Sequence, residues 1–115
     1  MSVRCMRIRL VAGGAERARQ WAKEIMSRSG EAMDTLKQEG VTLESVFLDQ
    51  LEGGDYLIYY KRSDMARALA AGRILADDLQ QYHRQFQKEA WVSGQPLELL
   101  VDLQMPASEQ ATSIP

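Results

Sequence analysis

The stretch Val41–Arg62 constrains the fold more than any other part of this sequence. Its two halves, VTLESVFLDQ and DYLIYYKR, are rich in β-branched, aromatic and leucine residues, which favour β-strands. Between them lies LEGG, whose glycines can adopt the positive φ that a short hairpin loop requires. The stretch therefore predicts a β-hairpin with Leu51–Gly54 as its loop.

This loop length predicts which residues face each other. The expected pairs are Gln50 with Asp55, Leu48 with Leu57, Val46 with Tyr59, and Glu44 with Lys61. Because side chains alternate along a strand, one face carries Leu43, Phe47, Tyr56, Ile58 and Tyr60, and the other carries Thr42, Glu44, Val46, Leu48, Leu57, Tyr59 and Lys61. A loop one residue longer or shorter would change this pairing.

The residues before the hairpin predict a strand and a helix. Residues 3–11 alternate as a strand does, and Gly13-Gly14 ends it. From Ala15 to about Gln38 apolar residues recur every three or four positions, which predicts an amphipathic helix. A break near Ser29-Gly30 is one alternative, and Gly40 is a natural helix stop.

The residues after the hairpin predict a second helix and a last strand. Ser63 or Asp64 can cap a helical region that runs to about Ala90, with Asp77-Asp78 as a point of interruption. Its apolar stripe is Met65, Ala68, Gly72, Leu75, Leu79, Tyr82 and Phe86. Ser93–Pro96 would end the helix, and the alternating residues Leu97–Leu103 predict the final strand.

The order β-α-β-β-α-β predicts an α+β fold, a ferredoxin-like sandwich. Its four-stranded antiparallel sheet has strand order 4-1-3-2, with both helices on one face. One domain spans residues 1–103, and residues 104–115 form a flexible tail. We expect the helices to cover Met6, Ile8, Leu10, Leu43, Phe47, Ile58, Tyr60, Leu99 and Val101.

The other sheet face mixes apolar and charged residues, namely Val3, Val46, Leu48, Leu57, Tyr59 and Leu100 with Arg7, Arg9, Lys61, Glu44, Glu98 and Asp102. Arg7 and Arg9 would pair with Glu98 and Asp102 on the neighbouring strand. Such an apolar patch favours a homodimer that packs sheet against sheet. A solvated face with cross-strand ion pairs is the alternative.

Composition narrows the class of protein. Net charge is −2 over 115 residues without a basic stripe, so no nucleic acid partner is expected. No apolar run approaches the roughly 18 residues of a membrane helix, and the N-terminus lacks the apolar segment expected of a signal peptide. The single cysteine, Cys5, fits a reducing compartment. We therefore expect a cytoplasmic protein with no membrane association. One His and one Cys cannot build a zinc site, and neither a metal nor another cofactor is predicted.

Candidate binding residues are few. His83, the one histidine, borders the apolar stripe of the second helix and could act as a general base or a hydrogen-bonding group. Glu44 interrupts an apolar strand, although a pair with Lys61 explains it equally well. Aromatic residues could line a pocket for a flat ligand, and these are Trp21, Tyr56, Tyr59, Tyr60 and Trp91. The alternative for all of them is a structural role in the core.

The order of elements resembles the dimeric α+β barrel superfamily. The strings GVTLESVFLD, GDYLIYY and YHRQFQKEAW resemble a family of small bacterial proteins of unknown function with that fold. The resemblance implies no catalytic residues, because fold alone does not select a function. We expect a homodimer that binds a small apolar or aromatic molecule between helices and sheet. The alternatives are a cofactor-independent enzyme of monooxygenase or isomerase type that uses His83, and a structural module without a ligand.

Overall fold

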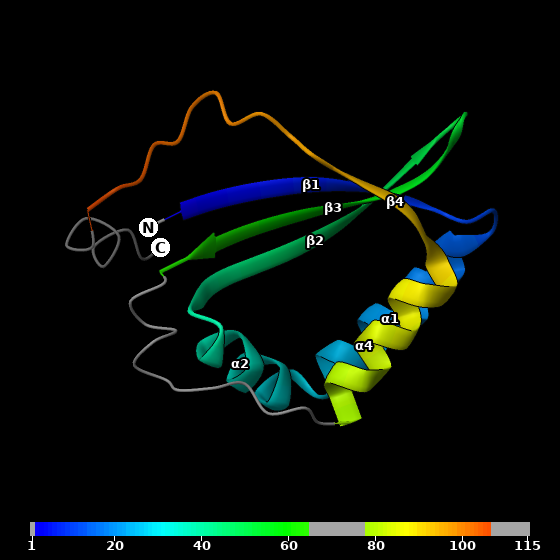
Figure 1. The fold of residues 1–115 in the computed structure, drawn as a ribbon, viewed down its shortest axis with the longest axis horizontal. Helices are drawn as coiled ribbons and strands as arrows, with labels where there is room; N and C mark the ends of the chain where they lie inside the picture. The colour runs from blue at the N-terminus through cyan, green and yellow to red at the C-terminus, as the bar shows by residue number, and fades with distance from the viewer. Residues whose placement is uncertain (1, 65–77, 107–115) are drawn as a thin grey trace, which may run out of the picture.

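A computed structural model describes residues 2–64 and 78–106. In chain order the elements are β1 (Ser2–Leu10), α1 (Gly14–Ser27), α2 (Ser29–Gln38), β2 (Val41–Leu51), β3 (Gly54–Ser63), α4 (Asp78–Ala90) and β4 (Trp91–Pro96). The four strands form one antiparallel sheet in the order β2-β3-β1-β4, and the helices lie on one side of it (Figure 1). The predicted α+β class, strand order and one-sided arrangement of helices are confirmed.

The hairpin pairs as predicted. Gln50 faces Asp55, Leu48 faces Leu57, Val46 faces Tyr59, and Glu44 faces Lys61. Pairing continues to Leu51 and Gly54, so the connection is tighter than the predicted four-residue loop. The composition of the strands and turn was therefore sufficient to determine this register.

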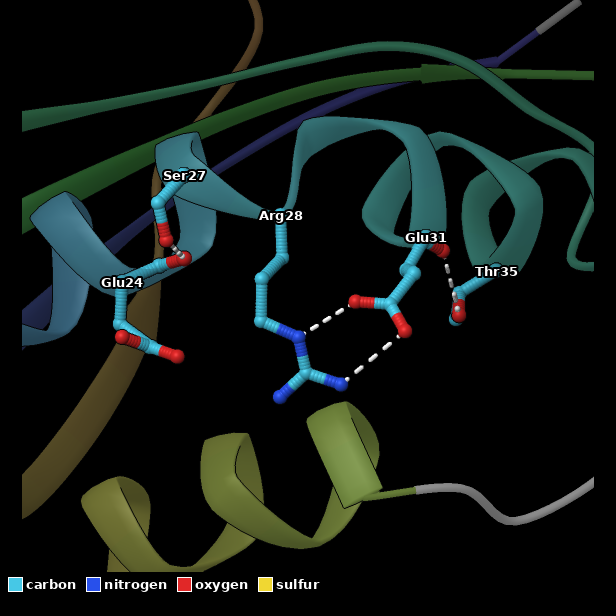
Figure 2. A network of polar contacts seen from close by, with 5 residues as sticks. All are labelled: Glu24, Ser27, Arg28, Glu31 and Thr35. Atoms are coloured by element: carbon cyan, nitrogen blue, oxygen red, sulfur yellow. Dashed lines mark hydrogen bonds and ion pairs between the residues drawn. The ribbon is translucent and has the colours of Figure 1, made fainter.

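The first helical region is two helices, which is the alternative raised for a break near Ser29-Gly30 rather than the single expected helix. Arg28 separates α1 from α2, with non-helical φ and ψ of −119° and 37°. The Ser27 hydroxyl donates to the Glu24 carbonyl oxygen at 2.7 Å, and the Arg28 guanidinium forms two hydrogen bonds with the Glu31 carboxylate (Figure 2). These local bonds satisfy polar groups where the helical ladder stops. The chain then leaves α2 through Gly40, whose φ is +77°.

The core lies between the sheet and the helices. Its buried residues are Ile8, Leu10, Ala18, Trp21, Leu57, Phe86 and Ala90. Trp21 of α1 stacks on Phe86 of α4 with ring centroids 4.7 Å apart. Arg17 and Glu89 also join these two helices, through a 3.2 Å ion pair. The contacts fix α1 and α4 side by side across the sheet.

The predicted assignment of the hairpin to the helix-covered face was wrong. Met6 pairs with Tyr59 and Ile8 with Leu57, so these four residues lie under the helices together. The residues predicted to lie there, Leu43, Phe47, Ile58 and Tyr60, are on the open face, where Phe47 is 59% exposed. Both hairpin faces are apolar, and a slip of one residue between β1 and β3 exchanges them.

The last strand lies earlier in the chain than predicted. β4 begins at Trp91, directly after α4, and pairs with β1 over the segment expected to be a turn. A Cβ at Gly94 would stand 3.0 Å from Ile8 Cδ1, so the absence of a side chain lets β4 lie close to the packed Ile8 side chain. Pro96 is tolerated because β4 is an edge strand, where a missing N–H interrupts no ladder. Leu97–Leu103, the expected strand, has no regular secondary structure.

Some predictions fall outside the described residues. These are the helical positions Met65, Ala68, Gly72 and Leu75, and the tail beyond residue 106. Of the predicted tail, residues 104–106 are described and form neither helix nor strand. None of the helices in the described part of the chain is long and apolar enough to cross a membrane.

Candidate binding pocket

A cavity of about 840 Å³ lies between the covered face of the sheet and the helices. Its apolar wall includes Met6, Val46 and Tyr59 from the sheet, Trp21, Ile25, Met33 and Leu36 from α1 and α2, and Trp91 from β4. Polar residues on the wall include Arg4, Glu39, Glu44, Lys61, His83 and Gln87. A cavity of this size with mostly apolar walls is typical of small-molecule sites.

His83 lies in the cavity wall, and its neighbours determine which ring nitrogen accepts and which donates a hydrogen bond. Trp21 Nε1 lies 3.1 Å from His83 Nδ1, and an indole N–H can only donate. Nδ1 therefore accepts, and the proton of the neutral ring is on Nε2. His83 Nε2 lies 3.1 Å from Gln87 Nε2, and two donors cannot bond to each other. The Gln87 amide is therefore turned over, so that its oxygen accepts from His83 Nε2–H. Trp21, His83 and Gln87 thus form a chain that leaves the Gln87 amino group as a donor.

The environment keeps His83 neutral. Burial lowers the pKa of the imidazole, and the positive charges of Lys61 and Arg84 lower it further. Protonation would also place an Nδ1–H against the Trp21 N–H, because both groups would then be donors. At neutral pH the ring therefore offers its Nε2–H, while its lone pair is engaged by Trp21.

Two donors on the cavity wall are left unused. Among the described residues, Tyr59 Oη and Trp91 Nε1 are buried and have no hydrogen-bond partner. The two rings meet edge to face, with centroids 5.4 Å apart. Burial raises the pKa of the Tyr59 hydroxyl, with a further contribution from Glu44, so the hydroxyl keeps its proton. A buried polar group without a partner costs about 1–3 kcal/mol, which a ligand atom can recover.

Glu44 and Lys61 face each other on β2 and β3 at the polar end of the cavity. No ion pair within 4.0 Å joins them among those of the described residues. Burial raises the pKa of the Glu44 carboxyl, while Lys61 partly opposes this shift. The cross-strand neighbourhood expected from the sequence is present, but the pair is open and both groups remain available to the cavity.

Some of the candidate binding residues named from the sequence line the cavity, and the others lie on the open face of the sheet. His83, Trp21 and Glu44 line the cavity together. Tyr56 and Tyr60 point to the open face, where guanidinium groups lie over their rings: Arg7 at 5.6 Å from Tyr56, and Arg62 at 5.7 Å from Tyr60. Because the two hairpin faces are exchanged relative to the prediction, Tyr56 and Tyr60 lie away from the cavity and Tyr59 lies in its wall.

Gln87 was missed by the sequence reasoning. It lies four residues after His83, so the two share one side of α4, and this spacing could have identified it. No group of three or more potential metal ligands occurs within residues 2–64 and 78–106. The polar groups that distinguish the cavity wall are its hydrogen-bond donors.

Comparison with known proteins identifies the family. The model of DUF6176, a family of unknown function, matches residues 1–108. The chain belongs to this family. DUF6176 covers the whole described fold, including the residues of the cavity, and its description records no activity.

Other similarities are weaker. A crystal structure of a conserved protein of unknown function from Bacteroides thetaiotaomicron VPI-5482, described as a possible oxidoreductase, aligns with 84% of this chain and 96% of that chain. Sequence identity is 19% and the TM-score is 0.49, so neither fold nor function is transferred from it. No curated protein matches the chain.

Proposed function

We propose that this DUF6176 protein binds a small apolar or aromatic molecule that carries a hydrogen-bond-accepting oxygen. The observation that supports this is the pair of buried, unpartnered donors, Tyr59 Oη and Trp91 Nε1, on the wall of a largely apolar cavity. Both residues line the cavity, and the proposal requires that each buried donor turn toward the ligand when it binds. A carbonyl or hydroxyl oxygen would satisfy them.

The remaining polar groups near His83 favour the same ligand. The chain from Trp21 through His83 ends on the Gln87 amino group, which is a third donor. Trp21 and Trp91 provide flat aromatic walls, and such rings stack on planar ligands. The site therefore combines an apolar shape with hydrogen-bond donors near His83.

Charge on the cavity wall is compatible with a neutral or anionic oxygen. Its basic residues are Arg4, Lys61 and Arg84, and its acidic residues are Glu39 and Glu44, an excess of one positive charge. Burial raises the pKa of the Glu44 carboxyl, because desolvation disfavours its charged form. A carboxylate or phenolate could therefore be accommodated at the Lys61 end, whereas an ammonium group would meet like charge.

An enzyme that uses His83 as a general base is less well supported. A base needs a free lone pair within reach of the substrate proton, and the lone pair of Nδ1 accepts from Trp21. His83 also presents its proton toward Gln87. The geometry thus favours His83 as a positioning residue for donors over a role in proton abstraction.

The test compares two ligands of the same shape, 2-acetonaphthone, a ketone, and 2-ethylnaphthalene, which lacks oxygen. The chain has two tryptophans, so an amide correlation NMR spectrum shows two indole N–H signals. We expect the ketone to shift the Trp91 signal downfield, because this N–H gains an acceptor. The Trp21 signal, already hydrogen-bonded to His83, should move less.

A variant then assigns the hydroxyl donor, while the NMR signal reports on Trp91. Tyr59→Phe keeps its ring but removes the hydroxyl, and should weaken ketone binding about 5- to 10-fold, as expected for one hydrogen bond of about 1 kcal/mol. Affinity for 2-ethylnaphthalene should not change, and Tyr56→Phe on the open face is the matched control. Equal affinities for both ligands would reject the donor role, and no binding of either would reject this ligand class.

A further inference from the structure

One end of the cavity is charged, and its charges form a single row across the sheet. Arg4 of β1 faces Lys61 of β3, and Lys61 faces Glu44 of β2. All three residues line the cavity. Because residues two apart on a strand share a face, Tyr59 lies beside Lys61 on the same wall, about 7 Å further along β3. The cavity therefore has a charged end next to a hydrogen-bond donor.

The two basic residues of this row lack an acidic partner. Arg4 and Lys61 are adjacent, and neither takes part in an ion pair among the described residues. The charge of Lys61 nevertheless acts across the cavity. Burial lowers the pKa of the His83 imidazole on α4, and the positive charge of Lys61 lowers it further. An anion at this end would therefore meet two cations that the described residues leave unpaired.

The acidic residues occupy one side of the row. Glu44 faces Lys61 from β2, and Glu39, which follows α2, lies on the same wall. Burial raises the pKa of the Glu44 carboxyl, Lys61 partly opposes this shift, and the negative charge of Glu39 adds to it. The acids are thus on the β2 side, while Arg4 extends the row toward β1. An anionic ligand group is therefore favoured between Arg4 and Lys61, away from Glu44.

We propose that the ligand is a planar aromatic carboxylate with a second oxygen at its opposite end. Its carboxylate lies between Arg4 and Lys61, and its carbonyl or hydroxyl oxygen accepts from the Tyr59 hydroxyl. A guanidinium group matches the two oxygens of a carboxylate, and the ammonium group of the neighbouring lysine adds a further donor. This inference rests on the proposed function, because it adds the charge and the orientation of the ligand in the same cavity.

Calorimetric titration of the full chain at neutral pH tests the proposal. The two probes are 6-acetyl-2-naphthoic acid and its methyl ester, which has the same aromatic body and ketone but no charge. We expect the acid to bind about tenfold more tightly than the ester, as one charge-assisted hydrogen bond predicts. This comparison uses the unmodified protein and needs no variant.

Variants of the row identify the groups that recognise the charge. Arg4→Met and Lys61→Met keep an unbranched side chain but remove one cation each, and should reduce the preference for the acid at least about threefold. Glu44→Gln removes the nearest negative charge and should increase the preference about twofold. Circular dichroism verifies that each variant is folded. Arg4→Lys keeps a cation and should retain part of the preference.

The open face of the same strand provides the matched control. Arg7 and Arg9 lie over the Tyr56 ring, 5.6 and 5.9 Å from its centroid. No ion pair among the described residues joins either arginine to Glu98 or Asp102, so the pairing predicted from the sequence was wrong. Arg7→Met removes a guanidinium group from β1 on the side away from the cavity. It should leave the preference for the acid unchanged.

The outcomes separate this inference from the proposed function. Equal affinities for acid and ester, or a preference that survives both Arg4→Met and Lys61→Met, would overturn the carboxylate site. Ketone binding that still weakens in Tyr59→Phe would then leave the proposed function standing. A preference that depends on Arg4 and Lys61, with no response to Tyr59→Phe, would instead overturn only the role of the hydroxyl. No binding of acid, ester or 2-acetonaphthone would overturn both proposals.

Discussion

The two faces of the sheet are built from alternating residues of the same strands and differ in what covers them. Leu57 and Ile58 are neighbours in β3, yet Leu57 is 2% exposed beneath the helices while Ile58 lies on the open face. The covered face borders a cavity at which the Tyr59 hydroxyl and the Trp91 N–H are buried. The open face instead holds arginines over tyrosine rings. Apolar composition alone therefore does not decide which side of a sheet becomes the core.

Substitutions at two neighbouring residues of β3, Leu57 and Ile58, should show the difference between the faces as the largest change in the free energy of unfolding. Leu57→Ala should lower the free energy of unfolding by about 2–5 kcal/mol, because it leaves a cavity in the core. Ile58→Ala should cost much less at concentrations where the chain is monomeric. Urea unfolding followed by circular dichroism measures both. Equal losses in the monomer would contradict the assignment of the two faces.

The pH dependence of stability probes the covered face further. The folded pKa of His83 lies below its unfolded value of about 6.5, so between these values the unfolded chain binds more protons. Stability is then complete above pH 6.5 and falls as pH decreases, by up to about 1.4 kcal/mol per pH unit. Urea unfolding from pH 7 to 5 should show this loss, and His83→Gln should abolish it.

Glu44 should change the pH dependence of stability in the direction opposite to His83, and so provides a control for the His83 prediction. Its raised folded pKa means that the folded state binds a proton first, so its contribution increases stability as pH falls. Glu44→Gln should therefore steepen the loss seen in the unmodified protein. A His83→Gln profile identical to that of the unmodified protein would show that the imidazole is not desolvated.

A smaller effect is expected from the hydroxyl groups of two tyrosines. Tyr59→Phe removes a buried hydroxyl that has no partner among the described residues, and should raise the free energy of unfolding by up to about 1 kcal/mol in the absence of ligand. Tyr56→Phe on the open face should have no effect. Thermal unfolding by calorimetry compares them. Destabilisation by Tyr59→Phe would mean that the hydroxyl has an acceptor in the free protein.

The smallest effect is expected at the break between α1 and α2. Arg28 and Glu31 pair on the side of the helices that points away from the sheet (Figure 2). Their side chains are 28% and 55% exposed, so solvent screens their attraction. Arg28→Gln should leave the urea midpoint unchanged within error, because packing rather than this pair holds the helices on the sheet. A loss similar to that of Leu57→Ala would refute this explanation of the covered face.

The sequence was sufficient where structure depends on neighbours in the chain. Strand and helix periodicity, the glycine turn after Leu51 and the interruption near Ser29 all follow from local chemistry, and the hairpin register follows from its turn. The site was only partly predictable. His83, Trp21 and Glu44 were identifiable by residue type, but Tyr59 could not be chosen over Tyr56 and Tyr60 without knowing the covered face.

Tertiary structure alone decided the pairing of β1 with β3 and the position of β4. The sequence provides two apolar faces on the hairpin, and the match of Met6 with Tyr59 selects one, because Trp21 and Phe86 can then pack on Ile8 and Leu57. Likewise Gly94 resembles a turn residue until Ile8 is opposite it. The sequence thus determined the order of strands and helices, but not the position of β4. Which surfaces they bury depends on contacts between residues far apart in the chain, where a shift of one residue reverses inside and outside.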